Sequence, residues 1–115
     1  LVDAAGNDVA VGEQGEILFH GPGITPGYFG NPAATAAAFT EDGWLKSGDV
    51  GRRDADGYYF IVDRIKDMYI SGGENVYPAE VESVLDNHPA ILEAIVIGVP
   101  DARWGEAGHA FVRLR

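Results

Sequence analysis

The sequence has 115 residues, 46% of them hydrophobic, which is enough for one ordinary domain or two small ones and argues against intrinsic disorder. Its 18 acidic residues against 8 basic ones give a formal net charge of -10, which excludes nucleic acid as a partner because such a surface repels phosphate backbones. The sequence has no cysteine and no apolar run of the ~20 residues that a membrane helix needs. We therefore expect no disulfide framework, no membrane span and a cytoplasmic location.

The first third of the chain predicts one short strand, a loop and one short helix. Residues 16–20 have an apolar centre and are bounded by glycines, as in a strand, whereas residues 21–32 hold too many Gly and Pro residues for regular structure. We expect Asn31 to cap a helix that has Pro32 at its first position and continues over 33–39, because asparagine is a preferred N-cap and proline suits the first turn.

The middle of the chain predicts a β-hairpin and, after it, a domain boundary. Strands over 50–53 and 58–62 flank the turn Asp54-Ala55-Asp56-Gly57, and the second strand is rich in aromatic and β-branched residues. A charged cluster over 63–67 follows. We place the boundary within it, which gives domains over 1–64 and 65–115.

The last part of the chain predicts a small β-α-β-β domain. Its expected elements are a strand over 68–71, a helix over 78–87, a strand over 93–99, a loop over 100–106 and a strand over 107–114. The helix is expected to be amphipathic, because Val81, Val84 and Leu85 fall at helical spacing. The predicted fold class is therefore α+β, a β-rich segment followed by this small domain.

One segment with a chemical signature reads Gly43-Trp44-Leu45-Lys46-Ser47-Gly48-Asp49-Val50. It resembles the motif of adenylate-forming enzymes in which an aromatic residue precedes a T/S-G-D triplet. The resemblance implies that Asp49 accepts hydrogen bonds from both ribose hydroxyls of an adenylate. A carboxylate suits this role because its two oxygens can hold a vicinal diol bidentately. By itself, a Gly-Asp pair more often marks a turn.

A longer run, from Ile61 to Glu82, reads I-V-D-R-I-K-D-M-Y-I-S-G-G-E-N-V-Y-P-A-E-V-E. It resembles, nearly residue for residue, the hinge motif of the AMP-forming acyl-CoA synthetases within that superfamily. The resemblance implies that Arg64 contacts the ribose or phosphate of the adenylate and that Lys66 is the hinge about which the C-terminal domain rotates. Without the resemblance, the charged residues around Arg64 and Lys66 would be interpreted as a solvated turn between strands.

The glycine pair Gly72-Gly73 within that run allows a loop to approach a ligand closely or to adopt positive φ, although most such pairs are only turns. In the family this loop lines the channel for the pantetheine arm of CoA, so the resemblance implies that role for both glycines. Glu74 and Asn75 follow. Two interpretations stay open for them, a catalytic role or helix initiation with local capping.

A third segment, Val99-Pro100-Asp101-Ala102-Arg103-Trp104-Gly105-Glu106, resembles the family's V-P-D-x-x-W/Y-G-E loop. There Trp104 would flank the CoA arm, whereas an indole beside a strand also packs as part of a core or lid, and both interpretations stay open. The histidines His20, His88 and His109 lack metal-ligand spacing, so we expect no metal site among them.

Together these resemblances cover nearly the whole chain and imply an ATP-dependent acid:CoA ligase. In such an enzyme a carboxylate attacks the α-phosphate of Mg-ATP to give an acyl-adenylate and pyrophosphate, and CoA then displaces AMP. The implied fold is the end of a large N-terminal domain, part of a distorted barrel, joined to most of a mobile C-terminal domain. The family's phosphate loop, acyl pocket and Mg2+-binding glutamate would lie upstream of Leu1, and its catalytic lysine downstream of Arg115. We therefore expect a fragment that contains no catalytic residue and is inactive alone.

Other functions remain open. Within the superfamily these are an adenylation domain that loads a carrier protein and a luciferase-like oxidase, and outside it a stand-alone nucleotide- or partner-binding module. The carboxylic acid substrate stays open among fatty, aryl and short-chain acids. Surfaces that would face the rest of the enzyme are expected to be exposed, which predicts non-native dimerisation or strand exchange of the isolated fragment.

Overall fold

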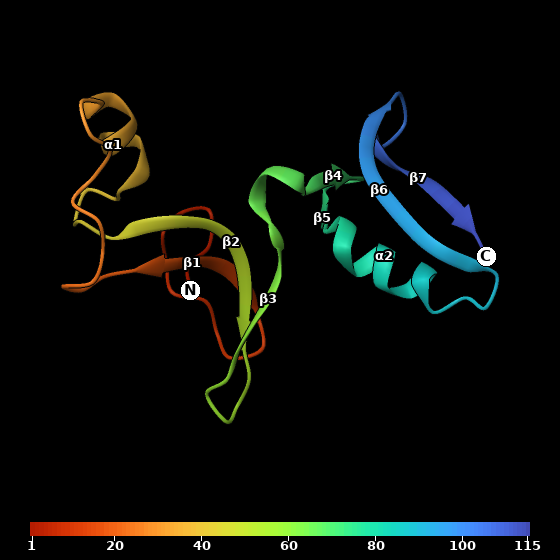
Figure 1. Cartoon of the computed structure of the whole chain (residues 1–115), viewed down its shortest axis with the longest axis horizontal. Helices are drawn as coiled ribbons and strands as arrows, with labels where there is room; N and C mark the ends of the chain where they lie inside the picture. The colour runs from red at the N-terminus through yellow and green to blue at the C-terminus, as the bar shows by residue number, and fades with distance from the viewer. The chain divides into compact units, whose positions relative to one another are not determined.

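A computed structural model describes all 115 residues, and the chain divides into two compact units, Leu1–Ile61 and Val62–Arg115 (Figure 1). The division falls slightly earlier than the boundary expected after Arg64. Strands dominate both units, with one α-helix in each. The predicted α+β class is confirmed. Neither helix is long and apolar enough to cross a membrane.

The first unit is built on a three-stranded sheet in the order β1-β2-β3. Its strands are β1 (Gln14–Phe19), β2 (Leu45–Arg53) and β3 (Tyr59–Arg64), and β3 continues past the end of this unit. β1 and β2 run antiparallel and lie side by side in Figure 1. Val50 of β2 is only 4% exposed and forms the centre of a small core.

The helix α1 (Pro32–Ala38) begins as the sequence predicts. The Asn31 side-chain oxygen accepts a hydrogen bond from the Ala34 N–H at 3.0 Å, and proline occupies the first turn. The helix ends one residue before the predicted limit, because Phe39 has an extended backbone and forms a bridge with Leu45.

The predicted hairpin turn after β2 is also confirmed. The Asp54 carboxylate accepts hydrogen bonds from the backbone N–H groups of Asp56 and Tyr58, and Gly57 has φ of +89°, which favours glycine. The strand before the turn is longer than predicted, since β2 begins at Leu45 rather than Val50. The S-G-D motif therefore lies within a strand.

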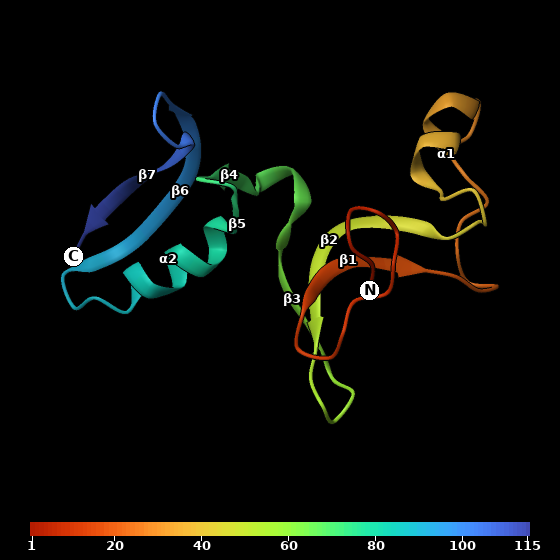
Figure 2. The same ribbon diagram turned by 180° about the vertical axis from the view of Figure 1, so that it is seen from behind.

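The second unit contains a four-stranded sheet in the order β5-β4-β7-β6. Its elements are the 3-10 turn η1 (Ile65–Asp67), β4 (Tyr69–Ser71), β5 (Glu74–Val76), α2 (Pro78–Asp86), β6 (Ile91–Asp101) and β7 (Gly105–Leu114). Figure 2 shows α2 running along β6. The order is thus β-β-α-β-β, and the predicted β-α-β-β order is wrong because it lacks β5.

The strand β5 changes the role expected for two residues. Glu74 pairs with Ser71 and Asn75 with Ile70, so both belong to a tight hairpin around Gly72-Gly73. The N-cap of α2 is Tyr77, and no side chain caps it. Of the two interpretations left open for Glu74 and Asn75, the one in which they cap the helix is therefore wrong, because the segment pairs with β4 before the helix begins.

The strands β6 and β7 form a long antiparallel ribbon, and the loop predicted over 100–106 is reduced to a turn over 102–104. At its middle Gly98 pairs with Gly108, and the side chain of Tyr69 fills the space above both glycines. Tyr69 is only 6% exposed. Two facing glycines therefore provide the depression that a buried aromatic ring needs.

Two carboxylates of the helix α2 form hydrogen bonds with β6. Glu82 accepts a hydrogen bond from the Val96 N–H at 2.8 Å, and Asp86 accepts one from the Ala94 N–H at 2.9 Å. β6 is at the end of the sheet, so these bonds occupy N–H groups that an edge strand would otherwise leave unpaired. Val84, predicted on the apolar face, is instead 73% exposed.

Candidate functional site

In the first unit, a β-bulge positions Asp49. The register between β1 and β2 shifts between Glu16 and Leu18, opposite the segment that contains Ser47, Gly48 and Asp49. Gly48 has φ of +74°, and its N–H donates to the Glu16 carboxylate at 3.1 Å. The bulge therefore depends on a glycine and on a carboxylate from the neighbouring strand.

The hydroxyl of Ser47 fixes the backbone around Asp49. Its Oγ accepts a hydrogen bond from the Asp49 N–H at 2.9 Å and donates to the Asp49 carbonyl at 3.4 Å. Asp49 itself is half-buried. A carboxylate held on a bulge is suited to receive two hydroxyl donors, although the diol contact stays a prediction.

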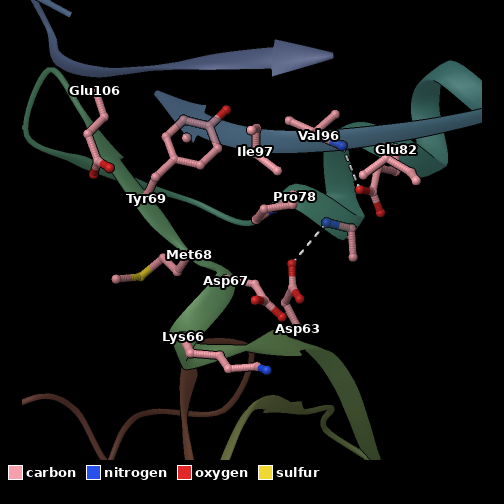
Figure 3. Close-up of a pocket in the computed structure, with 13 residues that line it drawn as sticks. Asp63, Lys66, Asp67, Met68, Tyr69, Pro78, Glu82, Val96, Ile97 and Glu106 are labelled. Atoms are coloured by element: carbon pink, nitrogen blue, oxygen red, sulfur yellow. Dashed lines mark hydrogen bonds between the residues drawn. The ribbon is translucent and has the colours of Figure 1, made fainter. Parts of the chain in front are cut away.

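In the second unit, η1 carries Lys66 and closes one side of a pocket of about 430 Å³. Figure 3 shows Lys66 on the same side of the pocket as Asp63 and Asp67. Lys66 is the only basic residue in the pocket lining, and it is exposed. Arg64 immediately precedes η1 and is exposed at the end of β3.

Three of the four acidic residues that line this pocket accept hydrogen bonds from backbone N–H groups. Asp63 accepts a hydrogen bond from the Ala79 N–H at 2.9 Å, in the first turn of α2, and Glu82 accepts the one from Val96 (Figure 3). Glu106 accepts a hydrogen bond from the Ile70 N–H at 2.9 Å. These bonds tie the end of β3, the helix α2 and β4 to their neighbours. Sequence analysis missed all three roles, because each partner is distant in the chain.

Gly72 and Trp104 form a direct contact at another point of the second unit. The Gly72 N–H donates to the Trp104 carbonyl at 2.9 Å, and a Cβ added to Gly72 would lie 2.8 Å from Trp104 Cε3. Gly72 has φ of +59° and Gly73 has φ of +88°, so both positions require the left-handed conformation that glycine tolerates. Glycine is therefore required at both positions by the backbone conformation, and at Gly72 also by the close contact with Trp104.

Trp104 combines this packing with exposure. Its side chain remains 49% exposed, and the guanidinium carbon of Arg103 lies 4.9 Å from the centroid of its ring. The structure therefore brings Gly72 and Trp104 together, with Arg103 added. Sequence analysis did not single out Arg103, although the V-P-D-x-x-W pattern contains it.

The histidines take part in local contacts. His20 lies with its ring centroid 4.9 Å from that of Trp44, His109 lies 4.8 Å from Phe111, and His88 Nδ1 accepts a hydrogen bond from the Ala90 N–H. No group of three or more His, Cys, Asp or Glu side chains gathers where it could hold a metal ion.

Comparisons with known proteins agree with both the fold and the motifs. Residues 80–115 match the family described as the AMP-binding enzyme C-terminal domain. A feruloyl-CoA synthase from an Amycolatopsis species is 54% identical over 112 residues, covering 97% of this chain and 23% of that protein. A medium/long-chain-fatty-acid–CoA ligase of Mycobacterium tuberculosis is 50% identical over 115 residues, covering 100% of this chain and 20% of that protein.

Among solved structures, the o-succinylbenzoate CoA synthetase of Bacillus subtilis in complex with its acyl-adenylate intermediate superposes with a TM-score of 0.88 at 46% identity. That alignment covers 99% of this chain and 23% of the other. The chain thus spans between a fifth and a quarter of the length of the relatives described here.

The fold and the motif-bearing segments are shared, at 46% identity, with an enzyme that was solved with its acyl-adenylate intermediate. The chain belongs to the adenylate-forming ligase superfamily, and within it the chain is similar to the AMP-forming acyl-CoA synthetases.

Proposed function

We propose that the protein containing this chain is an ATP-dependent acid:CoA ligase. It converts a carboxylic acid and ATP into an acyl-adenylate and pyrophosphate, and the thiol of CoA then attacks the acyl carbon and releases AMP. The observation that carries this proposal is the similarity to CoA ligases at 54% identity across 97% of the chain, which includes both compact units. These substrates also support a cytoplasmic location.

In this proposal the first unit binds the nucleotide through Asp49. Asp49 accepts hydrogen bonds from the two ribose hydroxyls, and the bulge with its Ser47 and Glu16 bonds supports that role by fixing the backbone around the carboxylate. Arg64, which belongs to the second unit, supplies a permanent positive charge for the ribose or phosphate of the adenylate. Mg2+ accompanies ATP, but no cluster of ligands in this chain fits it, so no residue here is assigned to the ion.

The second unit contacts the thiol substrate. Gly72 and Gly73 form the tight turn along which the pantetheine arm passes, and Trp104 presents its half-exposed indole beside them. Lys66 is the hinge that lets one site serve both steps, because a short turn such as η1 can absorb a change in a few dihedral angles. Glu74 and Asn75 remain candidates for contacts near the same turn, since both are exposed on β5.

Relatives of this chain are named for very different carboxylic acids. The relatives include a feruloyl-CoA synthase, a medium/long-chain-fatty-acid–CoA ligase and a 2-succinylbenzoate–CoA ligase, all between 50% and 54% identical to this chain. Comparable similarity to ligases of such different acids indicates that this region does not select the acid.

A carrier protein is a second candidate for the acceptor. A fatty acid–[acyl-carrier-protein] ligase from Streptomyces coeruleorubidus is 49% identical over 97% of this chain. In that case the same two steps would end on the thiol of a carrier-bound phosphopantetheine rather than on CoA.

The test uses the intact protein with ATP and a panel of aryl, fatty and short-chain acids. We expect pyrophosphate release and, with CoA present, acyl-CoA formation. Asp49→Asn should lower the rate of pyrophosphate release by about tenfold or more, since a charged hydrogen bond to the ribose is lost. Asp56→Asn, a charge change in an exposed turn, is the matched control and should leave the rate unchanged.

Absence of pyrophosphate release with every acid would contradict the proposal. We also propose that the 115 residues alone are inactive, because this chain spans only 23% and 20% of the length of two related CoA ligases, which are four to five times longer. Release of pyrophosphate by the purified 115-residue chain would contradict that second statement.

A further inference from the structure

The turn over 102–104 carries the neighbouring side chains of Arg103 and Trp104 on a backbone fixed by hydrogen bonds. The Asp101 carboxylate accepts hydrogen bonds from the N–H groups of Arg103 and Trp104, both at 2.8 Å. The Trp104 carbonyl is bound by Gly72, and Gly105 ends the turn with φ of +80°. Both side chains therefore start from backbone atoms that are tied to the sheet.

The guanidinium of Arg103 lies over the indole and has no carboxylate partner in the structure. Arg113, by contrast, forms an ion pair with Glu93 at 3.2 Å. In a chain with a net charge of -10, an exposed arginine that stacks on an aromatic ring and leaves its N–H groups available is a site for an anion.

We propose that Arg103 binds the phosphate at the end of the pantetheine arm while the Trp104 indole packs against the arm itself. This inference rests on the proposed function, in which the arm passes the Gly72 turn. The planar guanidinium can hold two phosphate oxygens at once, and stacking on the indole orders it beforehand. The arm phosphate is common to CoA and to the phosphopantetheine of a carrier protein, so the same contact would serve either acceptor.

The experiment uses the intact protein and compares three soluble thiols as acceptors. Pantetheine has no phosphate, phosphopantetheine has the arm phosphate alone, and CoA has the arm phosphate within its nucleotide. For each thiol, kcat and KM of thioester formation are measured with an acid that supports pyrophosphate release. The variants are Arg103→Gln, Trp104→Leu and, as a matched control, Arg113→Gln.

We expect Arg103→Gln to raise KM for phosphopantetheine and CoA by about tenfold, with KM for pantetheine and all kcat values unchanged. Trp104→Leu should raise KM for all three thiols, because each has the arm. Arg113→Gln should leave all values unchanged, since that arginine is paired with Glu93 on the ribbon.

An Arg103→Gln enzyme with unchanged KM values, or with an equal rise for pantetheine, would overturn the inference. A rise for CoA alone would overturn the assignment to the arm phosphate and transfer the contact to the other phosphates of CoA. If the wild-type protein makes no thioester with any of the three thiols, the proposed function fails, and the inference fails with it. Wild-type activity combined with an unaffected Arg103→Gln variant defeats the inference alone.

Discussion

At the scale of single residues, Gly72 and Gly73 have similar backbones but different surroundings. Their φ values are +59° and +88°, so an added side chain is strained at either position. A Cβ at Gly72 would press on the Trp104 ring, whereas a Cβ at Gly73 would meet nothing within 4 Å. Comparing the same substitution at the two positions therefore separates the free-energy cost of positive φ from the cost of overpacking.

We predict that Gly72→Ala and Gly73→Ala each lose about 1 kcal/mol of stability because of positive φ. Gly72→Ala should lose a further ~1–3 kcal/mol, because alanine overpacks the contact with Trp104. Urea unfolding followed by fluorescence measures both losses, with Trp44→Phe as background so that Trp104 is the reporter. Equal losses in the two variants would show that the Trp104 contact is unimportant.

The residue motifs were visible in the sequence, but the groups that support them were not. A Gly-Gly pair signals positive φ by itself, and the positive φ of Gly72 and Gly73 agrees with that expectation. The carboxylates of Glu16, Asp63 and Glu106 gave no such signal, because each accepts a hydrogen bond from a backbone N–H on another element. Such pairings depend on tertiary structure, which local patterns do not encode.

At the scale of secondary-structure elements, α2 protects the edge of the second sheet. Its Glu82 and Asp86 lie one helical turn apart and reach alternate residues of β6, Val96 and Ala94. The strand thus has partners on both sides, β7 on one and the helix carboxylates on the other.

We predict that Glu82→Ala destabilises the protein by about 1–2 kcal/mol, because the Val96 N–H is then left without its acceptor in a partly buried position. Glu74→Ala removes an equal charge from an exposed strand and should change stability by less than ~0.5 kcal/mol. Thermal or urea unfolding distinguishes the two. Equal stability of the two variants would show that the hydrogen bond between Glu82 and the Val96 N–H does not stabilise the edge of the sheet.

Elements with strong local signals were predicted well, and those formed by pairing were not. The Asn31 cap with Pro32 sets the start of α1, and the Asp54 turn sets the hairpin, both through contacts within a few residues. The strand β5 is only three residues long and exists because it pairs with β4. Pairing between β6 and β7 likewise extends β6 to Asp101 and begins β7 at Gly105, within the segment predicted as a loop.

At the scale of the whole molecule, large apolar side chains remain exposed in both units. In the first unit these include Tyr58 and Tyr59, at 69% and 59% exposure, and in the second Ile95 and Phe111, at 53% and 56%. Such exposure favours association, because covering apolar surface releases water from it.

We predict that the isolated chain self-associates as its concentration rises through the micromolar range. Sedimentation velocity should show the shift, and Ile95→Lys together with Phe111→Lys should reduce it, because charged side chains on the β6–β7 ribbon oppose contact between copies. A chain that stays monomeric at all concentrations would contradict this expectation.

In the proposed function, one chain joins a nucleotide-binding unit to a thiol-binding unit through a hinge at Lys66. Proline at this position fixes φ and removes an N–H, whereas alanine removes only the side chain. The most direct test measures pyrophosphate release and thioester formation separately in the intact protein with Lys66→Pro and Lys66→Ala. The account predicts that Lys66→Pro slows thioester formation by about tenfold or more and largely spares pyrophosphate release, and that Lys66→Ala affects both much less. Equal loss of both half-reactions in Lys66→Pro would contradict it.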